Sequence, residues 1–282
     1  MFKRVLVPLD GSMLAESALD PALHLAQRAN GTVYLMRVPI YIDSGAQISP
    51  EYQRAWTADA DLPEHEDVTA YLSKTQDKLL RPGVLVKIIV GEGERSEAIL
   101  DIAVTKNIDL ILMASHARSG ISRWLLGSVS GQVIRKSQVP VMIVRRPTNF
   151  NHILITLDGS DLAERVIEPA LAFASGFGSR ITFLHVKETK ALTIKDGEIE
   201  DSAQYLEKVT SKFVNMDEDA ETAVIKGSAA EEILSFAAQN KIDLIAMSTH
   251  GRSGLRKLFY GSVTEKVMCD SGCAMLITRP AE

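Results

Sequence analysis

The chain has 282 residues, of which 46% are hydrophobic and 24% charged, and its formal net charge is −5. At about 100–200 residues per domain, this length predicts two domains. The sequence contains no apolar run approaching the roughly 18 residues of a membrane-spanning helix. With 31 Lys and Arg against 36 Asp and Glu, the chain lacks the basic excess that attracts nucleic acid. We therefore expect neither a membrane span nor nucleic acid as a main partner.

The N-terminal segment and the cysteines both favour a cytoplasmic protein. Only five apolar or Pro residues lie between Arg4 and Asp10, too few for the apolar core of a secretory signal. The two cysteines, Cys269 and Cys273, cannot build a disulfide framework and have no Cys or His neighbours at zinc-site spacing. We expect two reduced structural thiols, with a local redox pair as the alternative.

The first half alternates strands with helices. Apolar, β-branched runs predict strands at 5–9, 32–38, 84–90, 109–114 and 139–144. Helical periodicity predicts helices at 13–29, about 68–80 and 95–106. The strands lack two-residue alternation, as is typical of parallel strands that are buried on both faces. The stretch 39–67 has no such periodicity, and we weigh a surface excursion against a lid over a site.

The second half repeats the first. Further strands are predicted at 152–157, 180–186, 222–225, 243–247 and 274–278. Residues 3–12 match 151–160 at a separation of 148, whereas 109–130 match 243–264 at 134, so the second copy lacks 14 residues in between. Pro147 and its polar neighbours break the pattern, giving domains 1–147 and 151–282. The sequence predicts an α/β fold of two tandem doubly wound domains, each with a five-stranded, mainly parallel sheet and helices on both faces.

Two places in each half are candidates for a ligand site, because open α/β sheets bind ligands beyond the carboxyl ends of their strands. The first is the turn after strand one, Asp10-Gly11-Ser12 or Asp158-Gly159-Ser160. Its carboxylate could accept hydrogen bonds from a ribose or a base amine. The alternative is that the turn only caps the next helix.

The second place is a glycine-hydroxyl segment after strand four, Gly127-Ser128-Val129-Ser130 or Gly261-Ser262-Val263-Thr264. Glycine allows close approach of an anion, the hydroxyls can donate, and a helix N-terminus adds free N–H groups. Ser262 and Glu265 also fit a capping box, but Gly131 stands at the corresponding Glu position of the first half. We therefore interpret the recurring segment as a phosphate-binding element.

With its preceding loop, this segment resembles the universal stress protein family, whose nucleotide-binding signature is G-x-x-G-x9-G-[ST]. The second copy maps to Ser248, Gly251, Gly261 and Ser262, and the first to Ala114, Ala117, Gly127 and Ser128. The first glycine is replaced in the second copy, and both leading glycines are replaced in the first. The resemblance covers both halves and implies an adenine nucleotide alpha hydrolase-like fold.

The resemblance also implies which residues hold the base, ribose and phosphates of ATP. In the second copy these are Asp158, Val186, Met247, Ser248, Gly251, Gly261, Ser262, Val263 and Thr264, to which we add Arg252 for the phosphates. In the first copy they are Pro8, Asp10, Val38, Met113, Gly127, Ser128, Val129 and Ser130. The valines and methionines could equally be core residues at strand ends. Thr156 stands where the first copy has Pro8. We assign no catalytic residue and no protein metal ligand; His116 and His250 are expected to make backbone hydrogen bonds within their turns.

The predicted function is a cytoplasmic, ATP-binding regulatory module of the stress response. The sequence has no Walker A lysine and no evident base for water, so we expect slow hydrolysis at most, with Mg²⁺ held mainly by the phosphates. The alternative is a protein-interaction scaffold that binds no nucleotide; an oxidoreductase is disfavoured because no G-x-G-x-x-G follows strand one. The resemblance implies that the halves pair through their final strands about a pseudo-twofold axis, and a further homodimer is left open.

Overall fold

The computed structural model describes residues 2–39, 67–115, 127–188, 197–213, 220–249 and 261–279. The first half contains β1 (Arg4–Pro8), α1 (Met13–Glu16), α2 (Leu19–Arg28), β2 (Thr32–Arg37), α4 (Val68–Lys78), β3 (Leu85–Val90), α5 (Arg95–Thr105), β4 (Leu110–Ala114), α6 (Ser128–Lys136) and β5 (Val141–Val144). The second contains β6 (His152–Leu157), α7 (Asp161–Glu164), α8 (Ile167–Phe177), β7 (Arg180–Glu188), α9 (Gly197–Phe213), β8 (Ala220–Gly227), α10 (Ala229–Gln239), β9 (Leu244–Ser248), α11 (Ser262–Asp270) and β10 (Ala274–Thr278).

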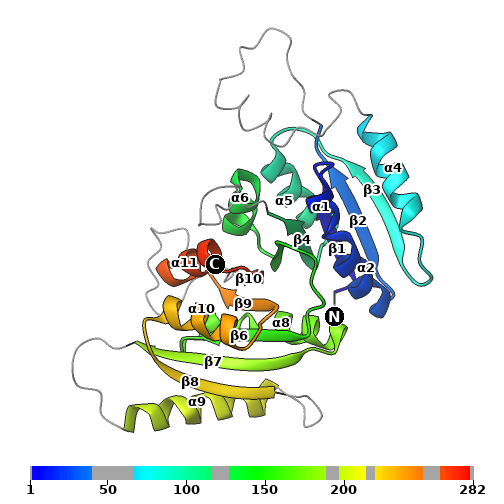
Figure 1. Cartoon of the computed structure of the whole chain (residues 1–282). Helices are drawn as coiled ribbons and strands as arrows, with labels where there is room; N and C mark the ends of the chain where they lie inside the picture. The colour runs from blue at the N-terminus through cyan, green and yellow to red at the C-terminus, as the bar shows by residue number, and fades with distance from the viewer. Residues whose placement is uncertain are drawn as a thin grey trace, which may run out of the picture.

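The ten strands of the described residues form one continuous sheet (Figure 1). Their order is β3-β2-β1-β4-β5-β10-β9-β6-β7-β8, parallel within each half and antiparallel only where β5 meets β10. Met142 pairs with Leu276 there, and these two residues hold equivalent positions 134 apart in the two copies. A pseudo-twofold axis therefore passes between them. The predicted doubly wound fold and the predicted pairing of the halves through their final strands are both confirmed.

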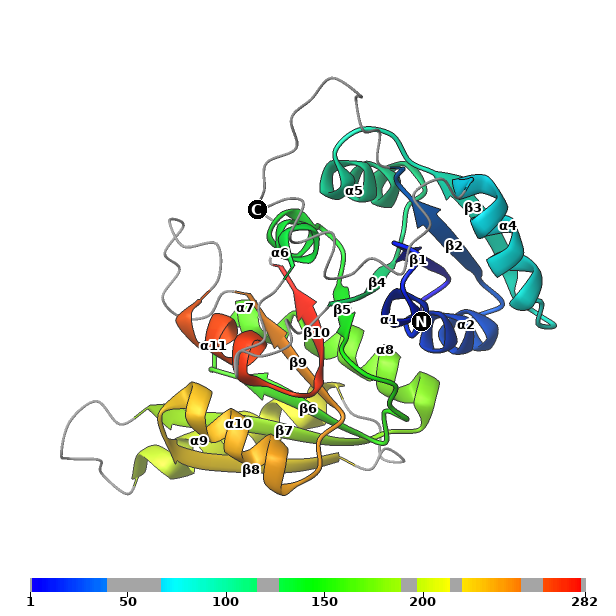
Figure 2. The same cartoon turned by 45° about the horizontal axis from the view of Figure 1, so that its top comes forward.

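Helices cover both faces of each half (Figure 2). Successive strand residues alternate between two apolar clusters, so that Val5 belongs to one face and Leu6 to the other, and neither is exposed. Helices α2, α4, α8 and α9 pack on the first face, and α5, α6, α10 and α11 on the second. Burial on both faces explains why these strands show no two-residue alternation in the sequence.

The predicted continuous helix 13–29 is wrong: the chain forms α1 and α2 with a turn at Ser17 and Ala18. The same break separates α7 from α8 in the second half. Pro21 and Pro169 lie in the first turn of α2 and α8. Proline has no N–H to donate to the carbonyl four residues earlier, so the helical ladder is interrupted before it.

The linker and two helices join the halves on one face of the sheet. Phe150 is 1% exposed, and its ring centroid lies 5.1 Å from that of Phe173 and 5.0 Å from that of Phe177. His24 of α2 stacks on Phe177 at 4.5 Å. A side chain at Gly176 would put its Cβ 2.7 Å from a Leu25 methyl. The close approach of α2 and α8 therefore depends on a glycine.

The 14 missing residues of the second copy lie between β7 and β8, because the separation of equivalent residues changes from 148 to 134 there. The corresponding long segment of the first half, residues 40–66, lies outside the described residues, so its two interpretations stay open. Within the described parts of the chain, no helix is both long and apolar enough to cross a membrane.

Both cysteines are free thiols. The Cys273 Sγ contacts the backbone oxygen of Ile242 at 3.0 Å, and burial raises the pKa of this thiol above its ordinary value. A raised pKa disfavours the reactive thiolate. These contacts favour the structural interpretation for Cys273.

Candidate functional site

Each half has one point where the strand order reverses, between β1 and β4 and between β6 and β9. In open α/β sheets, ligands bind beyond the carboxyl ends of the strands at such a point, and we call the point in each half the first and the second candidate cleft. The Asp-Gly-Ser turn follows β1 or β6, and the glycine-hydroxyl segment follows the loop after β4 or β9. The topology therefore brings the two predicted elements of each half to the same sheet edge.

The Asp-Gly-Ser turn is a helix cap in both halves. Asp158 Oδ1 accepts from Ser160 N at 3.0 Å and from Ser160 Oγ at 2.6 Å, and Ser160 Oγ accepts from Ala163 N at 3.2 Å. Asp10 and Ser12 make the same contacts in the first half. The alternative role predicted for this turn is therefore present. The aspartates lie at the sheet edge, with their Oδ1 atoms engaged in the turn.

The glycines of the second element are the N-caps of α6 and α11. Gly127 and Gly261 directly precede these helices, and among the described residues no side chain caps either one. Ser262 is the first helical residue rather than the cap, so the predicted capping-box alternative does not form. Within the part of the chain that the structure describes, the amides of residues 128–130 and 262–264 have no side-chain acceptor of the kind that satisfies most helix N-termini.

Two hydroxyls predicted as phosphate donors point into the protein instead. Thr264 Oγ1 donates to the backbone oxygen of Ser248 at 3.0 Å. Ser130 Oγ donates to the backbone oxygen of Gly127 at 3.1 Å. Both side chains are buried. Any contact of Thr264 or Ser130 with a phosphate would thus use the backbone N–H, whereas Ser128 and Ser262 are exposed.

The apolar residues predicted to contact ATP lie at or near the carboxyl ends of strands. Met113 and Met247 are 6% and 4% exposed, and Val38 and Val186 are half-buried against the same cluster. Their packing matches the core interpretation, and only the valines have surface left for a ligand. Near Val38, a side chain at Gly91 would place its Cβ 2.8 Å from a valine methyl, so this glycine gives the valine room.

The remaining strand-one positions also have structural roles. Pro8 ends β1, in register with Met36 of β2. Thr156, which replaces proline in the second half, is buried and donates to the Ala246 backbone oxygen at 3.4 Å. The predicted residues Gly251 and Arg252, and the loop histidines, lie outside the described residues.

The second candidate cleft contains a pair of buried hydroxyls, of which the sequence analysis predicted Ser248 but not Thr278. Ser248 and Thr278 pair in register at the carboxyl ends of β9 and β10. They are 7% and 5% exposed, and within the described parts of the chain neither hydroxyl oxygen has a hydrogen-bond partner. The equivalent residues of the first half are Ala114 and Val144. The sequence signal for this pair was the replacement of Val144 of the first half by a residue with a hydroxyl, Thr278, in the second half.

The unpartnered Thr278 hydroxyl has a measurable consequence. We expect Thr278→Val to raise the free energy of unfolding of the nucleotide-free protein by about 1 kcal/mol, because a buried, unsatisfied polar group costs about 1–3 kcal/mol. Urea denaturation measures the change. Thr278→Ser keeps the hydroxyl, removes a methyl group and should lower stability. A loss of stability in Thr278→Val would contradict the assignment.

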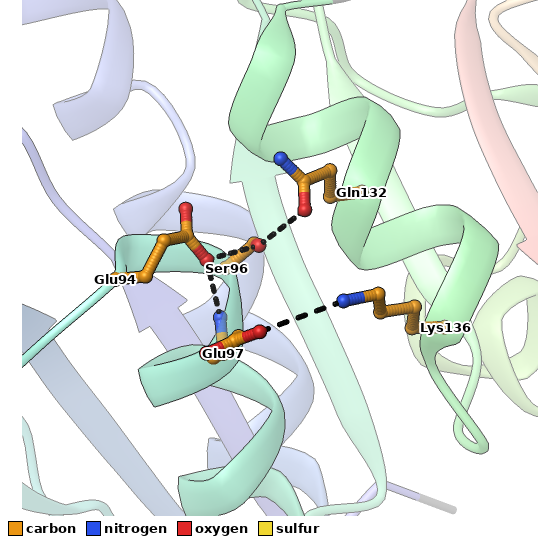
Figure 3. A network of polar contacts seen from close by, with 5 residues as sticks. All are labelled: Glu94, Ser96, Glu97, Gln132 and Lys136. Carbon is orange, nitrogen blue, oxygen red and sulfur yellow. Dashed lines mark hydrogen bonds and ion pairs between the residues drawn. The ribbon is translucent and has the colours of Figure 1, made fainter.

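Polar contacts hold α6 against α5 at the first cleft (Figure 3). Ser96 Oγ donates to Glu94 Oε2 at 2.6 Å and lies 3.1 Å from Gln132 Oε1. Lys136 Nζ lies 3.8 Å from Glu97 Oε1. The hydrogen bond from Ser96 is the main cause that lowers the pKa of Glu94. These contacts link the two helices where they lie side by side.

The second half uses an ion pair at the matching place. Lys266 Nζ of α11 lies 2.9 Å from Glu231 Oε1 of α10. Both side chains are more than one-third exposed, and such a pair stabilises a protein by no more than about 1 kcal/mol. The ends of α11 therefore depend on other contacts for their orientation.

The residues at the second cleft fit the phosphates of a nucleotide. The uncapped amides at the start of α11 are suitable donors to an anion. Gly261 has no side chain, and a Cβ there would lie 3.4 Å from the backbone oxygen of Thr249. The buried hydroxyls of Ser248 and Thr278 lie at the same sheet edge, and within the described residues they have no hydrogen-bond partner. These main-chain amides and small side chains are suited to hold an anionic group.

The fold defines a tandem doubly wound α/β protein, and proteins with such open sheets bind ligands beyond the carboxyl ends of their parallel strands. The model of the universal stress protein family matches residues 1–145 and 149–279. The chain therefore belongs to the universal stress protein family.

Similar proteins include single-domain and full-length relatives. A universal stress protein of Bacillus subtilis is 30% identical over 155 residues, covering 51% of this chain and 100% of that protein. Universal stress protein E of Salmonella typhi is 23% identical, and the match covers 100% of this chain and 96% of that protein. The crystal structure of a universal stress protein from Archaeoglobus fulgidus has a TM-score of 0.74 at 20% identity and full coverage of both chains. The last comparison supports the fold.

Proposed function

We propose that the chain is an ATP-binding regulatory module that acts in the cytoplasm as part of a stress response. The observation that carries the proposal is the pair of helix N-termini that follow Gly127 and Gly261 at the reversal points of the sheet, and that no side chain caps among the residues the structure describes. Family membership supports the choice of ATP, because the second copy keeps the last part of the family's nucleotide signature, Gly261-Ser262.

The second cleft is proposed to bind ATP more tightly than the first. It has Ser248 and Thr278 where the first half has Ala114 and Val144, and hydroxyl groups can donate to phosphate oxygens whereas methyl groups cannot. Gly251 also stands at a signature position where the first half has alanine. The clefts should therefore differ in affinity.

The module is proposed to bind ATP without rapid turnover. Fast phosphoryl transfer needs a positioned cation on the β- and γ-phosphates and a group that orients the attacking nucleophile. The sequence has no Walker A lysine. Mg²⁺ would be bound mainly by the phosphate oxygens, and it would neutralise part of their charge.

Thermal unfolding with and without ATP tests the proposal. A ligand at 100 times its Kd stabilises the folded state by about 2.7 kcal/mol, so saturating Mg-ATP should raise the Tm by several degrees. Nucleotide released by denaturing the purified protein, separated by chromatography, gives an independent readout. An unchanged Tm together with absence of bound nucleotide would favour the interaction scaffold.

A further inference from the structure

Each half of the chain sends one arginine across the central strand pair to a helix of the other half. Arg145 follows β5, and its Nη2 donates to the backbone oxygen of Met268 in the last turn of α11. Arg279 follows β10, and its Nη1 donates to the backbone oxygen of Arg135 in the last turn of α6. The two arginines are equivalent residues, 134 apart. The contacts are therefore reciprocal about the pseudo-twofold axis.

The end of a helix is a favourable place for these cations. The last four carbonyl groups of an α-helix have no partner within the helix, and the helix dipole makes this end negative. Arg145 is 6% exposed, and burial lowers its pKa to about 10, so it stays charged at neutral pH. A buried guanidinium is costly unless it is hydrogen-bonded. Arg145 therefore favours the position of α11 in which the Met268 backbone oxygen accepts its hydrogen bond.

The opposite end of each helix lies at a candidate cleft. Helix α11 has nine residues and a length of about 14 Å. At its start, Gly261 N donates to the Thr249 backbone oxygen at 2.8 Å, and Thr264 Oγ1 donates to the Ser248 backbone oxygen at 3.0 Å. At its end it is bound by Arg145. Because a short helix moves as a rod, contacts at both ends fix the direction of its N-terminal amides.

We propose that Arg145 and Arg279 are positioning residues that couple the two clefts, with the arginine of each half orienting the helix that forms the cleft of the other half. The coupling of ligand affinity between the two clefts rests on the proposed nucleotide binding. The mechanical link between each arginine and the helix of the other half does not. By linkage, a ligand that fixes α11 also stabilises the arrangement in which Arg145 binds it. The halves of one chain then act as a single responsive unit.

Hydrogen exchange of the full chain without nucleotide tests the mechanical link. In Arg145→Met the amides of α11 should exchange at least about tenfold faster and those of α6 should be unchanged, because the substitution removes the charge-assisted hydrogen bond to the Met268 backbone oxygen of α11. Arg279→Met should show the reverse pattern. Arg146→Met is the matched control, since Arg146 is adjacent to Arg145 but exposed, and it should change neither helix.

Only a crossed pattern supports the coupling. Equal acceleration in α6 and α11, or acceleration confined to the half that carries the substitution, would overturn the proposal. Arg145→Lys keeps the charge but not the planar donor group, and it should give the same pattern at smaller amplitude; this variant covers the case in which Arg145→Met fails to fold.

Nucleotide titration separates this inference from the proposed function. In a Gly127→Asp background, Arg145→Met should weaken ATP binding at the second cleft by about tenfold. Loss of all ATP binding in the unsubstituted chain would reject the proposed function and leave the exchange pattern to decide the link. Crossed exchange with unchanged ATP affinity would reject the coupling of the clefts.

Discussion

Replacing Phe150 by Ala is expected to lower the free energy of unfolding by about 3–5 kcal/mol, the usual cost of truncating a buried phenylalanine. The side chain is 1% exposed and packs against Phe173 and Phe177. Phe177 in turn stacks on His24 of the first half. The cavity would thus open beside the contact between α2 and α8. Urea denaturation followed by circular dichroism measures the loss.

Phe150→Leu is the matched control for this cavity. It keeps most of the apolar volume at a backbone position with φ of 54°, so backbone strain is the same in both variants. The cost should be less than half that of the alanine variant, because less volume is removed. A loss below about 1 kcal/mol in Phe150→Ala would show that the ring cluster does not hold the halves together.

Replacing Gly261 by Asp is expected to weaken ATP binding at the second cleft by at least about 100-fold. The backbone there has φ −64° and ψ 146°, and Asp is among the preferred N-cap residues. The new carboxylate should therefore cap the helix and leave the fold intact. It would occupy the amides of α11 and repel the triphosphate: two unit charges 4 Å apart interact by about 4 kcal/mol at an effective dielectric constant of 20.

Gly261→Asn separates charge from size. Asparagine is nearly isosteric with aspartate and caps helices equally well, but it is neutral. We expect it to weaken binding by about tenfold or less. Both variants are titrated in a Gly127→Asp background so that only the second cleft contributes. Equal affinity in Gly261→Asp and the parent would show that phosphates do not lie at this helix.

The repeat made most of the fold predictable from sequence. Strands buried on both faces must be apolar at nearly every position, so runs such as 109–114 and 243–247 could be recognised individually and confirmed by their copies. The break between α1 and α2 was missed because apolar residues continue at helical spacing through it. Pro21 was the local signal, and its recurrence at Pro169 shows that the break is a feature of both halves.

The clefts were less predictable than the fold. Sequence reasoning could place Gly127 and Gly261 before helices, since glycine followed by hydroxyl residues is typical of such positions. It could not tell that Thr264 binds Ser248 rather than a ligand, because the direction of a side chain depends on the tertiary approach of α11 to β9. The reciprocal contacts of Arg145 and Arg279 were invisible for the same reason.

Calorimetric titration of the full chain with Mg-ATP tests the central claim most directly. We expect saturable binding to the unsubstituted protein, with the tighter phase lost in Gly261→Asp and all binding lost in Gly127→Asp/Gly261→Asp. The double variant must remain folded by circular dichroism for the comparison to hold. Absence of saturable binding to the unsubstituted protein, or equal binding to the folded double variant, would contradict the assignment of ATP to these clefts.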